Sequence, residues 1–169
     1  MRRPGKGVTS VAIALIAAAI GGAVLSRSLH HSDAASRLAT QETVFVLLNH
    51  ERATHGLQPL TIDSKLTNAA RSHSADMLLH GYFAHGGRQG AWDVRLRRYV
   101  TRPLLGEVLK FGTGSYATAG GMVSAWMHSP PHRRVILTPD LRRVGLGIIT
   151  GTYRGSADVT MATGDFSSK

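Results

Sequence analysis

The hydrophobic pattern of the chain changes its period part-way along, and this change limits the fold more than any other feature. Through the first part of the domain, apolar residues recur at helical spacings, as in Leu66, Ala70 and Met77. Near the end, "VGLGIITG" and "DVTMATGDF" instead alternate and contain β-branched residues, with "TYRGSA" between them as a hairpin turn. Helices that come first and antiparallel strands that come last predict an α+β fold.

Start and stop signals divide the helical part into segments. Gly56 and Gly81 are placed to end two helices, and Asp63 or Ser64 is placed to cap the second one. In "SPPHRRVIL", Ser129 is a natural N-cap and Pro130 occupies the favoured first helical position. The expected helices cover residues 36–55, 64–80, 91–99, 116–129 and 130–137, with a connector at 56–63 and a strand-like run at 104–112.

The N-terminus has the layout of an export signal. The basic "MRRPGK" precedes the uncharged run 8–25, which is followed by Arg27 and a polar stretch. This run is long for the core of a signal peptide and marginal for a bilayer span, so both readings stay open. Residues 1–31 are therefore expected to be a signal peptide or a signal-anchor segment, with an apolar helix that precedes a domain at 36–169. We expect the domain to act outside the cytoplasmic membrane, either secreted or anchored.

Charge and cysteine content indicate the kind of partner. The chain has no cysteine and a formal charge of +10, only part of which lies in the leader. Burial rather than disulfide bonds must hold the fold together, and the basic excess favours anionic envelope polymers or membrane head groups as partners. The export signal and the scattered arginines argue against nucleic acid, and we expect a monomer. The densest basic cluster, interpreted as a solvated helix face, comprises Arg95, Arg97, Arg98 and Arg102.

Two histidines and one glutamate are the candidate functional residues. His85 in "GYFAHGG" and His132 in "SPPHRRVIL" each lie beside a helix end among small or rigid neighbours, where a scaffold can present a reactive imidazole. Glu107 in "LLGEVL" is an acid inside an apolar run and needs a partner if it is buried. Two imidazoles and a carboxylate suit a divalent metal such as zinc, or acid–base chemistry near neutral pH. His73, on the apolar face of its helix, is more typical of a hydrogen-bonded core histidine.

Several blocks of the sequence together resemble a known family. These are "LLNHERATHGLQPLTIDSKLTNAARSHSADMLLHGYFAHGG", then "GE", "AWMHSPPHRRVIL" and "VGLGI". In this order they resemble the CAP superfamily (SCP/PR-1-like domain; cysteine-rich secretory protein, antigen 5 and pathogenesis-related 1), and above all its cysteine-free bacterial branch. The resemblance runs from about Thr40 to Phe166. It implies a three-layer α-β-α sandwich with a mainly antiparallel sheet.

The resemblance also implies a cleft lined by two histidines and acidic residues. Its first histidine matches His85 in "FAH", its glutamate matches Glu107, and its second histidine matches His132 in the W-x-x-S-x-x-H-R block. This sequence departs from the family pattern at two positions. Val108 stands where an asparagine normally follows the glutamate, and Ser129, a neighbour of the cleft, stands where many members have a second acid. The resemblance therefore implies a site that is short of carboxylates.

The family resemblance does not imply one activity. Members bind divalent metals, sterols or fatty acids, and proteolysis has been proposed for a few. We expect a binding or envelope-interaction module rather than an enzyme, with the ligand, a lipid or a protein, left open. One alternative is a metal-dependent hydrolase in which His85 and His132 hold the ion and Glu107 is the third ligand or the base. The other alternative is a lipid or sterol binder.

Overall fold

The structure is a computed structural model that describes residues 35–169, and Arg37–Lys169 form one compact unit. The leader expected at 1–31 lies outside the described residues. Within residues 35–169, no helix combines the length and the apolarity needed to cross a membrane.

The helices and strands closely follow the hydrophobic pattern. A helix occupies residues 35–54 and ends before Gly56, whose φ of 68° lies in the left-handed region that glycine favours. The expected helices and the strand in the middle of the chain are all present. The later elements are β1 (Thr61–Ile62), α2 (Ser64–His80), α3 (Trp92–Arg97), β2 (Leu105–Gly112), the 3-10 helix η1 (Gly114–Ala117), α4 (Ala119–His128), α5 (Pro130–Ile136), β3 (Arg143–Tyr153) and β4 (Ser156–Ser167).

The four-stranded sheet has the order β1-β3-β4-β2 and is mixed rather than mainly antiparallel. β3 and β4 form the expected hairpin, and β2 pairs with β4 in antiparallel fashion. β1 pairs with β3 in parallel, with Thr61 opposite Arg143. The sequence did not reveal β1, because a strand of two residues inside the connector is too short to leave an alternating pattern.

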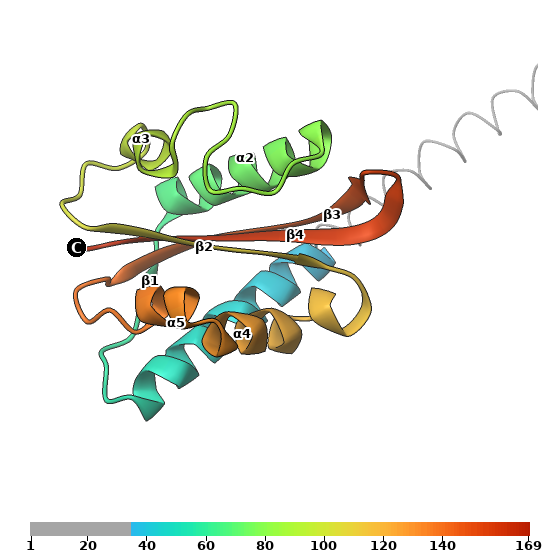
Figure 1. Ribbon diagram of the computed structural model, residues 1–169. Coiled ribbons are helices and arrows are strands. Elements are labelled where there is room, and N and C mark those ends of the chain that lie inside the picture. Colours follow the sequence, from blue (N-terminus) through green and yellow to red (C-terminus); the bar gives the residue numbers. More distant parts are fainter. Residues whose placement is uncertain (1–34) are drawn as a thin grey trace, which may run out of the picture. The chain divides into compact units, whose positions relative to one another are not determined.

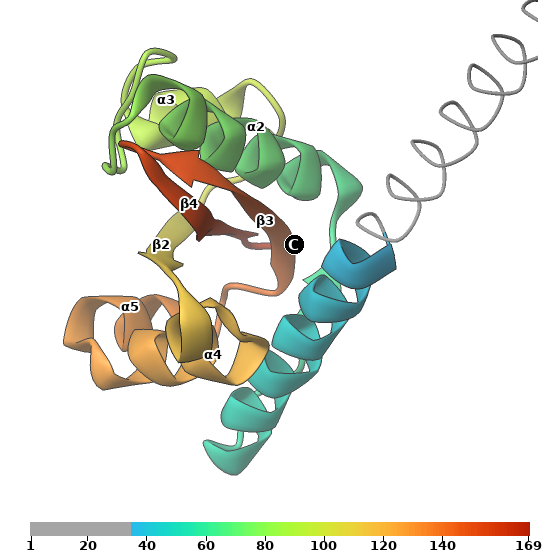
Figure 2. The same ribbon diagram turned by 90° about the vertical axis from the view of Figure 1, so that its right-hand side faces the viewer.

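Helices cover both faces of the sheet. α2 and α3 lie on one face, and the 35–54 helix, α4 and α5 lie on the other (Figures 1 and 2). The larger core fills the second interface and is centred on Trp126 and Phe166, both fully buried. The Trp126 indole donates a hydrogen bond to the carbonyl of Leu109 at 3.0 Å, which ties α4 to the edge strand β2.

Candidate functional site

His85 lies in a loop that the end of α2 positions. Gly81 caps α2 with a φ of 64°, so the chain turns sharply there instead of continuing as a helix. The buried His73 of α2 then holds the loop through a 3.0 Å hydrogen bond from its Nε2 to the carbonyl of Ala84, the residue before His85. The interpretation of His73 as a core histidine is confirmed. It anchors the segment that presents His85.

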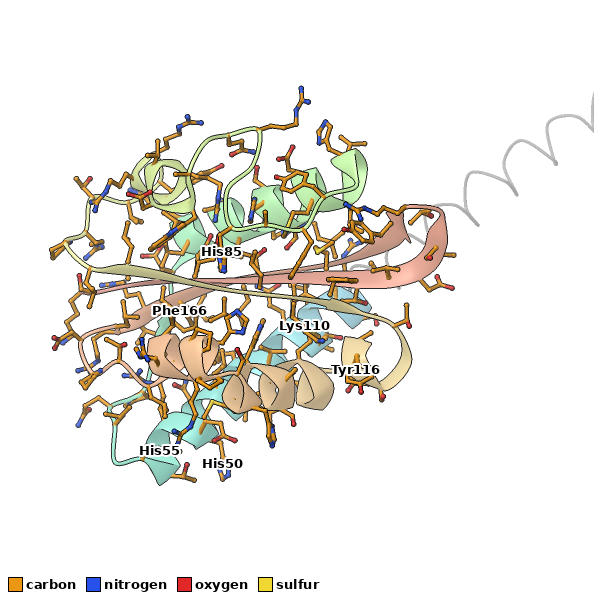
Figure 3. The ribbon with its side chains drawn as sticks, viewed as in Figure 1. His50, His55, His85, Lys110, Tyr116 and Phe166 are labelled. Carbon is orange, nitrogen blue, oxygen red and sulfur yellow. The ribbon has the colours of Figure 1, made fainter. Side chains whose placement is uncertain are left out.

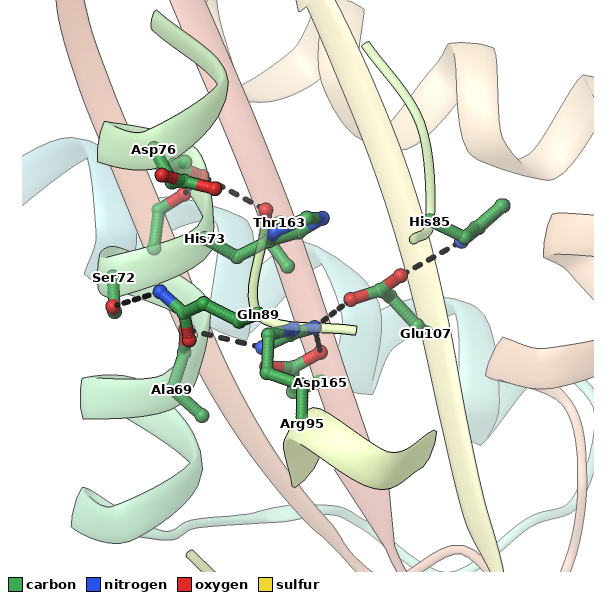
Figure 4. A network of polar contacts seen from close by, with 12 residues as sticks. Ala69, Ser72, His73, Asp76, His85, Gln89, Arg95, Glu107, Thr163 and Asp165 are labelled. Carbon is green, nitrogen blue, oxygen red and sulfur yellow. Dashed lines mark hydrogen bonds and ion pairs between the residues drawn. The ribbon is translucent and has the colours of Figure 1, made fainter. Parts of the chain in front are cut away.

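Glu107 holds the imidazole of His85 from behind. The Nδ1 of His85 lies 2.8 Å from Oε1 of Glu107, and because a carboxylate oxygen accepts, Nδ1 is the donor. The side chain of His85 is 49% exposed, whereas that of Glu107 is 1% exposed. Figure 4 shows Glu107 projecting from β2 toward this imidazole. With Nδ1 engaged inside the protein, Nε2 is the nitrogen that remains to act as a ligand or an acceptor.

A buried arginine joins Glu107 to a second carboxylate. Arg95 of α3 donates from Nη2 to Oε2 of Glu107, and its two terminal nitrogens lie 3.1 and 3.2 Å from the carboxylate oxygens of Asp165 on β4 (Figure 4). The side chain of Arg95 is 1% exposed, so the interpretation of a solvated cluster was wrong for this residue. α3 is a short helix that turns Arg95 and Leu96 toward the sheet while Arg97 and Arg98 remain exposed.

Asp165 is a site residue that the sequence reasoning missed. It lies directly opposite Glu107 in the β2–β4 register, and it is fully buried. Burial raises the pKa of Asp165, and the neighbouring Glu107 raises it further, while Arg95 opposes this rise. Like Glu107, it is an acid inside an apolar alternating run, in "MATGDF", so the criterion that identified Glu107 also applies to it.

His132 approaches His85 from the other side of the sheet edge. It lies in the first turn of α5, and the centroids of the two imidazole rings are 6.4 Å apart. Burial, followed by the proximity of His85, lowers the pKa of His132, which favours its neutral form. Figure 3 shows His85 on the α2 side of the sheet, whereas α5 lies on the opposite side. The structure thus brings His85, Glu107 and His132 together.

The two positions that depart from the family pattern differ in their environments. Val108 is fully buried in the core shared by Trp126 and Phe166, on the face of β2 opposite Glu107. Ser129 is half-buried at the junction of α4 and α5, and its carbonyl accepts from the Arg133 N–H at 2.8 Å. Its hydroxyl makes no capping hydrogen bond, so the expected N-cap is present in the backbone only.

The arrangement limits how a metal could be held. Both oxygens of Glu107 are engaged within the protein, one by His85 and one by Arg95. Among residues 35–169, no group of three or more His, Cys, Asp or Glu side chains is arranged to hold a metal ion. The groups that remain available at the site are the two imidazoles, which suit weak coordination with positions open to an outside ligand.

The His85–His132 pair is open to solvent, since the side chain of His85 is 49% exposed and His132 is only partly buried. One pocket of about 550 Å³ lies beside α4 and α5 and is lined by Arg133, Arg134 and apolar residues such as Leu137, without either histidine of the pair. For this reason we describe the pair as a surface site.

Comparison with known proteins agrees with the order of the sequence blocks and with the fold. Residues 45–166 match the sequence model of CAP, the cysteine-rich secretory protein family. The chain belongs to the CAP family. Among its relatives are two Bacillus subtilis proteins: YkwD, 34% identical over 113 residues, and the membrane protein YlbC, 29% identical over 111 residues. The alignments cover 66% and 64% of this chain but only 43% and 31% of those relatives.

Solved structures share the CAP fold. An extracellular protein of Bacillus anthracis that contains an SCP domain is similar with a TM-score of 0.66 and 26% identity, over 78% of this chain and 41% of that protein. An outer surface protein of Borrelia burgdorferi is similar with a TM-score of 0.65 and 18% identity, over 78% of this chain and 94% of that protein. The second likeness shows the fold alone.

We expect this CAP domain to lose stability in mild acid because His73 is buried. Burial lowers the pKa of His73, the charge of Arg95 adds to this effect, and Glu107, Ala84 and Asp76 oppose it. The unfolded chain therefore binds a proton more readily, and stability falls as the pH drops from about 6.5 through the lower native pKa. In chemical denaturation between pH 7 and pH 5, we expect His73→Gln to show a shallower loss than the wild type, by at most about 1.4 kcal/mol per pH unit. Parallel curves for the two proteins would contradict this prediction.

Proposed function

We propose that this CAP protein is an extracytoplasmic binding module whose ligand engages the paired imidazoles of His85 and His132. The observation that carries the proposal is the hydrogen bond between Nδ1 of His85 and the buried Glu107. A half-exposed imidazole gains little from packing, yet a buried carboxylate, itself held by Arg95, fixes its tautomer and orientation. A fixed tautomer and orientation are useful for an imidazole that binds a ligand.

Placement outside the membrane rests on two independent observations. The basic and then uncharged N-terminus has the layout of an export signal. The matched Bacillus anthracis protein is described as extracellular, and the relative YlbC is described as a membrane protein. N-terminal sequencing of the mature protein shows whether the leader is removed.

A divalent metal ion such as zinc fits the donor set, as a weakly held ion. An imidazole that donates its other N–H to a carboxylate is the usual partner of zinc, and His85 has this arrangement. Zinc would supply a positive centre to which a carboxylate or another anionic group of the ligand binds. His85 and His132 would hold the ion. Glu107 would orient the imidazole of His85 without contacting the ion itself.

The same geometry favours binding over hydrolysis. A general base must reach the proton that it removes, but Glu107 is buried and both of its oxygens are engaged. The fully buried Asp165 is bound by Arg95 and faces the same restriction. Neither carboxylate of the site is therefore placed to activate a water molecule.

Titration of zinc into the purified full chain tests the proposal. We expect His85→Ala and His132→Ala each to abolish or weaken zinc binding by at least about tenfold, because only two protein ligands are present. Glu107→Gln should weaken binding about 10- to 100-fold, because it no longer orients His85 as a carboxylate does. Isothermal titration calorimetry at neutral pH measures the three effects.

A matched control separates the pair from histidines in general. His50 is exposed on the 35–54 helix, far from β2 in Figure 3, and His50→Ala should bind zinc as the wild type does. We expect the two site variants to unfold within about 1 kcal/mol of the wild type, since partly exposed side chains contribute little packing. Equal binding by all variants would place the metal elsewhere, and no binding by the wild type would remove zinc from the proposal.

A further inference from the structure

Gly106 occupies a strand position at which no turn requires a glycine. It is buried in β2 next to Glu107, and its φ is not positive. Glycine weakens a strand, so a glycine in ordinary extended backbone marks a place where another part of the protein packs closely. Because side chains alternate along β2, Gly106 faces the α5 side of the sheet, whereas Glu107 projects from the opposite face.

Val135 of α5 fills the space that Gly106 leaves open. A Cβ at Gly106 would lie 2.8 Å from Cγ1 of Val135 and 3.2 Å from Cδ1 of Leu141. Carbon atoms in good contact are about 3.5–4.0 Å apart, so α5 could not lie this close to β2 beside an alanine. Valine is stiff at χ1, and the buried Leu141 occupies the adjoining space. Gly106 therefore sets the separation of α5 from β2.

The contact at Gly106 is close to both imidazoles of the candidate site. Val135 and His132 are three residues apart in α5, so they lie on the same side of the helix and about 4.5 Å apart along its axis. Glu107, the next residue of β2, holds the imidazole of His85. Two successive residues of β2 thus position the two histidines, Glu107 by a hydrogen bond and Gly106 through the packing of α5.

Arg52 fixes the C-terminal end of α5. Its side chain is fully buried, and its Nη1 donates to the carbonyl oxygens of Ile136 and Thr138 at 2.7 and 3.0 Å. A guanidinium suits this place because the last carbonyls of a helix carry partial negative charge. With this end held, a push at Val135 tilts α5 and moves its first turn, which carries His132.

We propose that Gly106 is a positioning residue of the His85–His132 site, because the space that it leaves for Val135 lets α5 hold His132 close to His85. The inference rests on the proposed function of the histidine pair and adds the residue that sets the separation of the two imidazoles. An alanine here must displace Val135 by roughly 0.7 Å, the difference between 2.8 Å and an ordinary carbon–carbon contact. Metal–ligand distances are set to within about 0.2 Å, so this displacement is large enough to disturb the site.

Zinc titration of the full chain with Gly106→Ala tests the inference against a matched control. Gly164→Ala places a methyl group 2.9 Å from Cγ2 of Val108, its partner in β2, so it overlaps a valine to a similar extent without meeting α5. We expect Gly106→Ala to weaken zinc binding about tenfold or more, and Gly164→Ala to bind zinc as the wild type does. Adding Val135→Ala to Gly106→Ala removes the overlapping methyl group and should restore binding.

Nuclear magnetic resonance gives a readout that does not depend on zinc. The ring protons of His85 and His132 should show a nuclear Overhauser effect in the wild type, since the ring centroids are 6.4 Å apart. We expect Gly106→Ala to weaken this effect and the added Val135→Ala to restore it. The Nδ1–H resonance of His85 should stay unchanged in both variants, because Glu107 still accepts from it.

The two readouts separate the positioning role from the proposed function. Loss of the Overhauser effect in Gly106→Ala, with no zinc binding by the wild type, overturns the metal part of the proposed function and supports the positioning role. Unchanged zinc binding and Overhauser effect in Gly106→Ala, equal losses in Gly164→Ala, or no rescue by Val135→Ala each overturn the positioning role. A wild type that shows neither zinc binding nor the Overhauser effect overturns both. If Gly106→Ala does not fold, Val135→Ile adds a methyl group to the same contact from the helix side, and unchanged readouts in that variant overturn the role.

Discussion

Replacing Arg95 with methionine should lower the free energy of unfolding by about 3–5 kcal/mol. Arg95 is the cation between two buried carboxylates, Glu107 and Asp165, and all three side chains are at most 1% exposed. Although burial alone would lower its pKa, Asp165 and Glu107 raise the pKa of Arg95, so it stays charged. Without it, two carboxylates remain buried side by side with no cation. Urea denaturation followed by circular dichroism measures the loss.

Two further variants show whether charge or packing causes this loss. Arg98→Met, on the exposed side of the same segment, should change stability by less than about 0.5 kcal/mol. Adding Asp165→Asn to Arg95→Met removes one of the uncompensated charges and should restore part of the lost stability. If the double variant is no more stable than Arg95→Met, the loss is one of packing, and the electrostatic account of the network is wrong.

The Arg95 variant also connects stability to the site. Glu107 accepts hydrogen bonds from both Arg95 and His85. Loss of the Arg95 hydrogen bond therefore changes the charge distribution of the Glu107 carboxylate, and with it the hydrogen bond to His85. We therefore expect Arg95→Met to weaken zinc binding together with stability, whereas Arg98→Met changes neither. The network reaches His85 through Glu107, so Arg95 is a positioning residue.

The sequence predicted those parts of the fold that depend on near neighbours. Gly81 ends α2 because its φ is positive, and Asp63 begins it by accepting from the N–H groups of Lys65 and Leu66. Both signals lie within a few residues of the helix that they limit. Glu107 was found for a similar reason, since an acid within an apolar run is visible without any knowledge of its partner.

The partners within the site could not be predicted from these patterns. His85, Glu107 and His132 lie far apart along the chain, and their convergence depends on how α2, β2 and α5 meet at one sheet edge. The family resemblance supplied that convergence. The sequence reasoning misjudged Arg95 because a cluster of arginines is usually solvated. Arg95 turns inward because it pairs with the buried carboxylates of Glu107 on β2 and Asp165 on β4.

The close approach of α2 to the sheet is likewise a property of the tertiary structure. In "VGLGI" the sequence showed two glycines inside a strand, where glycine weakens the strand and signals that another backbone comes near. The structure identifies that backbone as α2. A Cβ at Gly145 would overlap the backbone of Leu66 and Thr67, and one at Gly147 would overlap that of Ala70 and Arg71.

Gly147→Ala should therefore destabilise the domain by about 3 kcal/mol, near the upper end of the cost of overpacking. The atoms that the added methyl group meets belong to the helix backbone, so no side-chain rotation relieves the overlap, and α2 must move away from β3. Because α2 carries His73 and leads into the loop of His85, this movement should also weaken zinc binding. Thermal unfolding followed by circular dichroism measures the loss of stability.

Gly120→Ala is the matched control, since Gly120 lies within α4 and a Cβ there would meet nothing within 4 Å. Alanine costs less backbone entropy than glycine in a helix, so this variant should gain about 0.5–1 kcal/mol. The same substitution is thus expected to act in opposite directions at two glycines, according to whether another backbone lies against the site. Equal stability of the two variants would mean that the backbone of α2 does not pack closely against the glycines of β3, and this would contradict the close contact described here.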